Sequence, residues 1–179
     1  MNIIEKIRRY FYRKKLAEEL AHQSVQRQMT TLAEAKNVGI LFDATDITQH
    51  NVYIKFADSL KKEGKQVKLL GYIHGNANAV FNFDAFGNKN INWYHIPAGN
   101  NIQSFIENSF DILINAYFEE NLSLEYISLL SRAKFRVGAY QQIHEQISDF
   151  MVQMKPEQNI QAFFDAINHY LHTLVVAYD

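Results

Sequence analysis

The segment from Phe110 to Tyr140 constrains the fold of this chain more than any other part of the sequence. A short apolar run over residues 112–114 stops at the polar Asn115, apolar residues then recur at helical spacing over 124–133, and a second apolar run covers 135–139. A strand, a helix and a strand of this size form a βαβ unit, whose two strands lie side by side, parallel and buried on both faces. The segment therefore predicts an α/β fold.

The same alternation of strand and helix signals precedes and follows this unit. Residues 38–42 and 66–73 are strand-like runs, and the helix predicted between them starts at Thr48 as its N-cap and ends at Gly64. A last strand is expected over 149–152. Strands that alternate with helices form a parallel sheet between helical layers. We therefore expect a three-layer domain with a mainly parallel sheet of about five strands.

Residues 74–100 are the least regular part of the predicted domain. Phenylalanines at 81, 83 and 86 alternate imperfectly, and residues 91–96 could add a strand before Pro97 and Gly99 end the segment. The sequence leaves open whether this region forms a hairpin or an irregular loop.

The N-terminal region has a different character. Residues 2 to about 35 contain neither glycine nor proline and consist largely of strong helix formers, which predicts one long helix. We divide the chain into a basic amphipathic helical arm over 1–36 and an α/β domain over 37–179. In the arm, an apolar stripe runs beside six cations that face a single acid, Glu5. The residues that we expect to make contacts are Ile4, Ile7, Arg8, Arg9, Phe11 and Arg13.

Two interpretations of this arm stay open. In one, it is a contact surface for a partner protein, a second copy of the chain or an anionic membrane surface. In the other, the helix packs its apolar stripe on its own domain and leaves its cations in water. The formal net charge is −1, so the chain outside the basic arm is acidic on balance and we expect no nucleic-acid partner.

Composition narrows the chemistry further. The sequence contains no cysteine, which removes disulfides, thiolate metal sites and cysteine nucleophiles and suits a reducing cytoplasm. Its apolar runs are far shorter than the roughly 20 residues that span a bilayer. Cations interrupt the N-terminus where a signal peptide would have its apolar core. We expect a soluble, cytoplasmic protein.

Polar residues at the predicted strand ends define a candidate ligand site. Asp43 and Asp46 follow the first strand, His74 follows the second and Asn115 ends the strand at 112–114. Carboxyl ends of parallel strands share one edge of a sheet, where such folds bind ligands. The plainer alternative is that loops at this edge simply collect polar residues. We assign no catalytic residue, no metal site and no cofactor.

Phosphate binding of the usual kind is disfavoured by the sequence. It has neither a G-x-x-x-x-G-K-[ST] nor a G-x-G-x-x-G motif, and the turn after the first strand contains two acids and no glycine. Carboxylates in that turn would repel a phosphate from the backbone amides.

The chain resembles a family of small uncharacterised bacterial α/β proteins, a domain of unknown function. The likeness is carried by VGILFDATD, by GKQVKLLGY at 64–72, by the segment 110–140 and by DFMVQM. The resemblance implies a basic N-terminal helix before a compact α/β domain. No activity is established for that family, so the resemblance implies no catalytic residue. A more distant likeness is to the N-terminal half of heptosyltransferase-type glycosyltransferases, through Arg136-Val137-Gly138. The chain lacks the second domain that holds the nucleotide sugar in that family.

The sequence thus favours a non-enzymatic binding or interaction module of the bacterial cytoplasm that makes contacts through the arm. The alternative is an enzyme, or a degenerate glycosyltransferase-like half domain, that acts on a sugar or another small polar metabolite.

Overall fold

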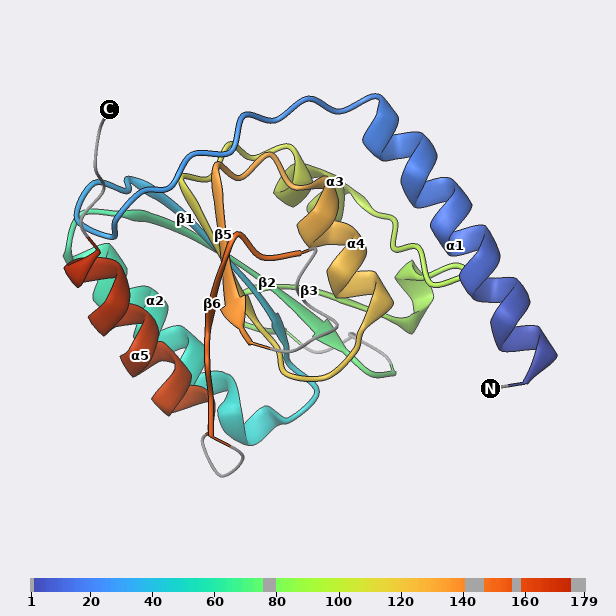
Figure 1. Cartoon of the computed structure of the whole chain (residues 1–179). Coiled ribbons are helices and arrows are strands. Elements are labelled where there is room, and N and C mark those ends of the chain that lie inside the picture. Colours follow the sequence, from blue (N-terminus) through green and yellow to red (C-terminus); the bar gives the residue numbers. More distant parts are fainter. Residues whose placement is uncertain (1, 76–79, 141–146, 156–158, 175–179) are drawn as a thin grey trace.

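A computed structural model describes residues 2–75, 80–140, 147–155 and 159–174 of the chain. Within them a single sheet lies between two layers of helices (Figure 1). The strands are β1 (Asn37–Asp43), β2 (Gln66–Ile73), β3 (Asp84–Gly87), β4 (Ile112–Ala116), β5 (Phe135–Ala139) and β6 (Phe150–Val152). The α-helices are α1 (Ile3–Ala21), α2 (His50–Lys62), α3 (Asn100–Ile106), α4 (Leu122–Leu130) and α5 (Ile160–Thr173).

Every strand pair in the sheet is parallel, which confirms the predicted fold class. The strand order is β3-β2-β1-β4-β5-β6, with six strands instead of about five. The chain builds outward from β1 to β3, then crosses to the other side of β1 and builds outward again to β6. This is the order of doubly wound folds, whose ligands bind where the order reverses, between the carboxyl ends of β1 and β4.

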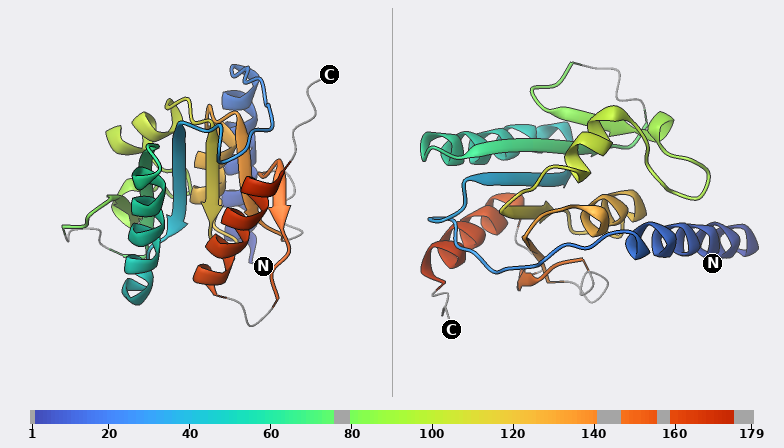
Figure 2. Two further views of the ribbon diagram at one scale, coloured as in Figure 1. Left: turned by 90° about the vertical axis from the view of Figure 1, so that its left-hand side faces the viewer. Right: turned by 90° about the horizontal axis from the view of Figure 1, so that it is seen from above.

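Helices cover both faces of the sheet (Figures 1 and 2). On one face α2 and α5 bury aromatic and aliphatic side chains against the strands, with Phe56 and Phe164 stacked at 4.1 Å between ring centroids. On the other face α3 and α4 enclose a second core around Phe105 and Phe110. Burial on both faces explains the continuous apolar runs of β1 and β4.

The segment between β2 and α3 differs from both alternatives that the sequence left open. The additional strand is β3, which pairs with β2 through residues 84–87, and no strand forms over 91–96. After the 3-10 helix η2 (Asn88–Asn90), a tight loop is closed by an isolated antiparallel bridge between Ile91 and Pro97. Asn92 holds this loop by accepting hydrogen bonds from the backbone amides of Tyr94 and Ile96.

The N-terminal helix is shorter than predicted. It ends at Ala21, and the chain then runs along the domain without helical structure until β1. Leu32 in this stretch is fully buried, and its backbone amide donates to the carbonyl of Leu171 on α5. Residues 22–36 therefore cover part of the core. The burial of Leu32 and its long-range backbone hydrogen bond outweigh the helical propensity of the segment.

The start of α2 also differs in detail. Asp46, not Thr48, caps the first turn, which is the 3-10 helix η1 (Ile47–Gln49), by accepting from the amide of Thr48 at 2.9 Å. Either residue type can cap a helix, and Asp46 takes the position because the first helical turn begins two residues earlier than predicted.

Candidate functional site

Two surfaces of the described chain carry the sequence-predicted residues. One is a hollow at the carboxyl ends of β1, β2 and β4, which we call the carboxyl-edge cleft. The other is the outward face of α1 together with Trp93, which we call the α1 surface. Its residues are Ile3, Ile4, Ile7, Tyr10, Phe11 and Trp93.

The carboxyl-edge cleft has a volume of about 780 Å³ and opens at the point where the strand order reverses. Three of the four predicted ligand-binding residues line it, namely Asp43, Asp46 and His74. Residues 116–121, which follow β4, supply the opposite wall. The structure thus brings together side chains from three strand ends, as the parallel arrangement predicts.

The two aspartates in the cleft differ in how many hydrogen bonds their carboxylates accept. Asp43 ends β1, and one of its carboxylate oxygens accepts from the amide of Thr45 at 2.9 Å. Asp46 uses both oxygens to cap the next helical turn, from Thr48 and from the side-chain amide of Gln49. Hydrogen bonds from Thr48 lower the pKa of Asp46 below its ordinary value. Asp46 is therefore held as a structural cap, and Asp43 is the better placed of the two to meet a ligand.

His74 is oriented by its neighbours. Its backbone amide donates to Thr45 Oγ1 at 3.0 Å, and its ring Nδ1 lies 3.3 Å from the hydroxyl of Tyr72. That hydroxyl also donates to Asn88 Oδ1 at 3.2 Å. A tyrosine hydroxyl has one proton, so this network is satisfied when Nδ1 carries the imidazole proton. The other ring nitrogen, Nε2, is then an acceptor.

Asn115 does not join this group. It lies inside β4, which continues to Ala116, and it is only 2 % exposed. Its side-chain amide donates to the carbonyl of Ile147 at 3.3 Å, on the α4 side of the sheet. The sequence placed Asn115 at the strand exit because an asparagine interrupts an apolar run, but here it satisfies a buried backbone carbonyl.

The charges in the cleft disfavour one class of ligand. The carboxylates of Asp43, Asp46 and Glu119 line it, and a phosphate would meet like charge from each. Glu120 also lines the cleft, but its carboxylate is paired with Arg9. Among the described residues no group of three or more histidine and acidic side chains is arranged to hold a metal ion. The cleft suits a neutral or cationic polar molecule.

The α1 surface arises from an unexpected orientation of the helix. Tyr12, on the opposite side of α1, is buried against α4, and its hydroxyl donates to the carbonyl of Leu122 at 2.9 Å. The guanidinium of Arg9 donates to both carboxylate oxygens of Glu120 at 2.7 Å, and Glu5 Oε1 lies 3.2 Å from Arg9 Nε. The helix is thus attached to the domain through the buried ring of Tyr12, through Leu16 and through the Arg9–Glu120 ion pair.

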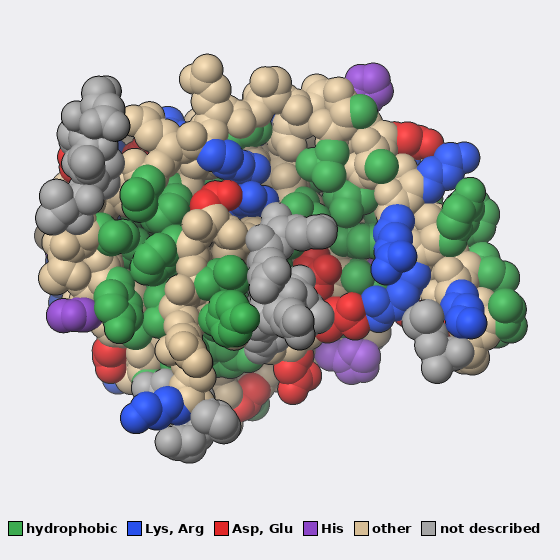
Figure 3. All heavy atoms as spheres, in the orientation of Figure 1, with side chains coloured by type: hydrophobic (Ala, Val, Ile, Leu, Met, Phe, Trp, Pro, Cys, Tyr) green, Lys and Arg blue, Asp and Glu red, His purple; other side chains and the backbone are tan. Residues whose placement is uncertain are grey.

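The apolar stripe of α1 consequently faces outward. Its five residues are between 42 % and 70 % exposed. Trp93, 51 % exposed on the loop closed by the Ile91–Pro97 bridge, extends the stripe, because its ring lies 5.7 Å from that of Phe11. Hydrophobic and cationic side chains lie side by side along α1 at the right of the molecule (Figure 3). Most of the stripe is thus exposed to solvent, and Phe11 is the residue of the stripe whose ring lies against the domain, at Trp93 and Tyr94.

The six contact residues predicted in the arm divide between the two sides of α1. Ile4, Ile7, Phe11 and Arg13 are exposed on the outward side, whereas Arg9 points to Glu120. Arg8 is half-buried, and its Nη1 atom lies 4.0 Å from Glu5 Oε2. Reasoning from sequence favoured a place in the core for Trp93 and did not connect it with the arm. It also missed Tyr72, which stands two residues before His74 at the end of β2.

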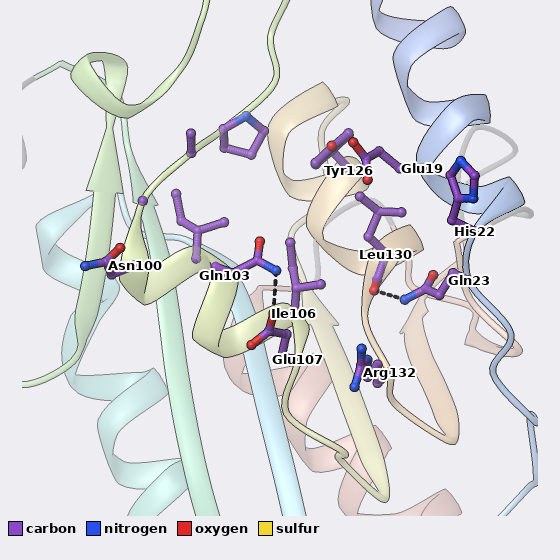
Figure 4. A pocket seen from close by; sticks show the side chains of 14 residues that line it. Glu19, His22, Gln23, Asn100, Gln103, Ile106, Glu107, Tyr126, Leu130 and Arg132 are labelled. Atoms are coloured by element: carbon purple, nitrogen blue, oxygen red, sulfur yellow. Dashed lines mark hydrogen bonds between the residues drawn. The ribbon is translucent and has the colours of Figure 1, made fainter.

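A further hollow of about 440 Å³ lies between the end of α1, α3 and α4 (Figure 4). Three of its polar side chains are engaged with one another or with the backbone. Gln103 donates to Glu107 at 2.7 Å along α3, and the side-chain amide of Gln23 donates to the carbonyl of Leu130. It contains none of the residues that the sequence singled out for ligand binding.

The model of a family described as "Family of unknown function (DUF6913)" matches residues 8–174, which cover α1 from its second turn, the whole sheet and α5. A search of curated proteins found no match. Within the described residues, no helix combines the length and the apolar character needed to cross a membrane.

Proposed function

Because the chain belongs to DUF6913, a family of unknown function, we propose its role from its geometry: a non-enzymatic docking module that binds a negatively charged surface through the α1 surface. We place this role in the cytoplasm, in keeping with the absence of cysteine from the sequence.

The observation that carries the proposal is the outward direction of the apolar stripe. A surface helix usually buries its apolar face, because removing apolar area from water is the main favourable contribution to packing. In α1 the buried side instead holds Tyr12 and the Arg9–Glu120 ion pair, and the isoleucines stay in water. Contiguous exposed apolar side chains of this kind mark interaction sites.

The charges around the stripe specify the kind of partner. Lys6, Arg13 and Lys14 are exposed on α1, and none of them forms an ion pair with another described residue. Lys15 is paired only within the helix, with Glu18 and Glu19. A partner surface that carries negative charge would gain attraction from all these cations, and long-range attraction would speed its encounter with α1.

Sedimentation of gently lysed, cross-linked host cells tests the proposal without assuming what the partner is. The stripe variant is Ile4→Gln/Ile7→Gln/Phe11→Gln, because glutamine removes the apolar groups and keeps helical propensity. The matched control is Ile47→Gln/Tyr170→Gln, which changes apolar residues that are exposed elsewhere. We expect the wild type and the control to sediment with larger assemblies and the stripe variant to sediment as a free chain. A wild type that sediments as a free chain contradicts the proposal.

A small-molecule function is the second candidate, and one observation favours it: Asp43, Asp46 and His74 line one cleft at the switch point of the sheet. The carboxylates there favour an uncharged or cationic ligand, such as a sugar or an amine. Thermal-shift screening with phosphorylated and unphosphorylated members of each class would test it. A stabilising compound whose effect is lost in Asp43→Asn/His74→Gln supports this candidate, and the absence of any shift removes it.

A further inference from the structure

The geometry points to the acidic headgroup region of a lipid bilayer as the partner of the α1 surface, with α1 lying in the plane of the interface. This inference rests on the proposed docking function and names its partner.

A second copy of the chain fits the α1 surface poorly. Two copies that met through this surface would bring together two sets of basic side chains, because Lys6, Arg13, Lys14 and Lys15 lie on or beside the stripe in each copy. Like charges in contact cost free energy and steer copies apart. Glu18 is the only acid that helical spacing places within the stripe. The charge pattern therefore calls for an anionic partner of another kind.

The shape of the surface favours a bilayer over a folded acidic protein. The α1 helix lies at the outer edge of the molecule, and its first turns extend beyond the sheet and the other helices (Figure 2). The isoleucines and Tyr10 stand exposed on this edge, and Phe11 and Trp93 line a hollow of about 330 Å³ together with Tyr94. Protein interfaces concentrate their binding energy in well-packed pockets. A projecting helix with isoleucine and aromatic side chains suits shallow insertion between lipid headgroups.

The arrangement of side chains matches that of in-plane helices. By helical spacing, Lys6 and Arg13 flank the apolar stripe on one side, and Arg8 and Lys15 flank it on the other. Cations in these positions can reach the headgroups while the stripe enters the acyl boundary. A weak apolar anchor needs a second signal for stable binding, and a basic cluster next to it supplies that signal at an anionic leaflet.

Trp93 fixes how the domain would meet the membrane. Its ring contacts Phe11 at 5.7 Å and Tyr94 at 5.6 Å, so the 91–97 loop would enter the interface together with α1. Tryptophan and tyrosine rings favour this depth of the bilayer. Another hollow, of about 530 Å³, is lined by Glu5, Arg8 and Trp93, and it shares Tyr72 and His74 with the carboxyl-edge cleft. Docking would therefore bring the carboxyl edge of the sheet close to the headgroups.

The single tryptophan of the chain makes a direct experiment possible. The purified full chain would be titrated with phosphatidylcholine vesicles with and without phosphatidylglycerol, some of them brominated on the acyl chains. We expect Trp93 emission to shift to the blue and to be quenched by brominated lipid only when phosphatidylglycerol is present. Added salt should weaken the binding, because it screens the cations. The stripe variant should bind at least about tenfold more weakly, and the Ile47→Gln/Tyr170→Gln control should bind like the wild type.

The outcomes separate this inference from the docking function. If the stripe is needed for association in cells but phosphatidylglycerol vesicles leave Trp93 emission unchanged, the docking function stands and the membrane inference is overturned. A Trp93 shift that depends on protein concentration in the absence of vesicles indicates self-association and also overturns it. Quenching by brominated lipid that the stripe variant loses supports it. Circular dichroism of each variant verifies that α1 and the domain remain folded.

Discussion

Glu125, in the first turn of α4, shows how strongly local burial acts on a single residue of this chain. Partial burial of its side chain, and to a lesser extent the neighbouring charge of Glu120, raise the pKa of Glu125 to about 7. Its Oε1 atom is buried and accepts no hydrogen bond from a described residue. A carboxylate at a helix N-terminus is usually favourable, but here desolvation outweighs the helix dipole.

Replacing Glu125 should therefore stabilise the protein in a pH-dependent way. The folded-state pKa lies above the unfolded value of 4.5, so the native state binds more protons between pH 4.5 and about 7 and the wild type loses stability as the pH rises through that window. We expect Glu125→Gln to gain about 1–2 kcal/mol at pH 8, discounted for partial exposure, and close to nothing at pH 4. Urea unfolding at both pH values measures this difference. A gain that is equal at both values contradicts the assignment.

The ligand-binding residues show what sequence reasoning can reach at the residue scale. Asp43 and His74 directly end or follow strands in the sequence, and parallel pairing is enough to bring such residues to one edge. The position of Asn115 depended on whether its strand stopped one residue earlier or later. The side chain of Asn115 binds the buried carbonyl of Ile147, which is 32 residues away in the sequence. The residues around Asn115 give no sign of this partner.

At the scale of elements, the direction in which α1 faces could not be predicted. The sequence gives an apolar stripe and its spacing, but it does not say what the stripe meets. The orientation depends on Glu120 and on the carbonyl of Leu122, which lie more than a hundred residues away from Arg9 and Tyr12. The Arg9–Glu120 ion pair, the hydrogen bond from Tyr12 to Leu122 and the burial of Tyr12 together determine which side of α1 faces the domain.

The other differences between elements have similar causes. Residues 22–36 have helical propensity but run along the domain and cover the core. The backbone amide of Gln28, for example, donates to the carbonyl of Lys134. Residues 91–96 have strand-like composition, but His95 takes a positive φ of 69° and the segment turns back on itself. In both segments tertiary contacts override local preference, so their structure could not be predicted from the sequence. The longer strands and helices follow their local preference and were predictable.

The edge strand β6 depends on one ion pair. Asp149 accepts from the backbone amide of Arg136 at 2.8 Å and from its guanidinium at 2.9 Å, and Arg136 is only 8 % exposed. Although desolvation opposes ionisation, these hydrogen bonds hold the pKa of Asp149 below its ordinary value. The pair therefore joins β5 to the start of β6.

Removing the carboxylate of this pair should be costly. Asp149→Asn leaves the cation of Arg136 buried beside a neutral group, and we expect a loss of about 2–4 kcal/mol in the free energy of unfolding at pH 7. Because the folded-state pKa is lowered, the wild type gives up the same contribution as the pH falls below 3.8, so the difference between the two proteins should shrink there. Denaturant titrations at neutral and acid pH measure it. A variant as stable as the wild type at pH 7 would show that the pair does not hold β6.

At the scale of the whole molecule, the parallel sheet between two helical layers followed from the sequence, because buried parallel strands read as continuous apolar runs. The order of the strands did not follow, since either side of β1 is available to a returning chain. That order places the carboxyl-edge cleft between β1 and β4, and it places α1 and Trp93 beside the cleft on the α4 side. The two surfaces for which we propose binding roles therefore lie next to each other at one edge of the molecule.

The account depends most on the claim that α1 turns its apolar stripe outward, and thiol labelling measures this directly in a chain without native cysteine. Ile7 is exposed on the stripe, whereas Leu16 lies on the opposite side and packs against the core around α4. The labelling rates of Ile7→Cys and Leu16→Cys would be compared with those of the same variants in denaturant. We predict that Ile7→Cys reacts almost as fast as its unfolded form and that Leu16→Cys reacts at least about tenfold more slowly than its own. Protection at Ile7→Cys together with rapid labelling at Leu16→Cys would contradict the account.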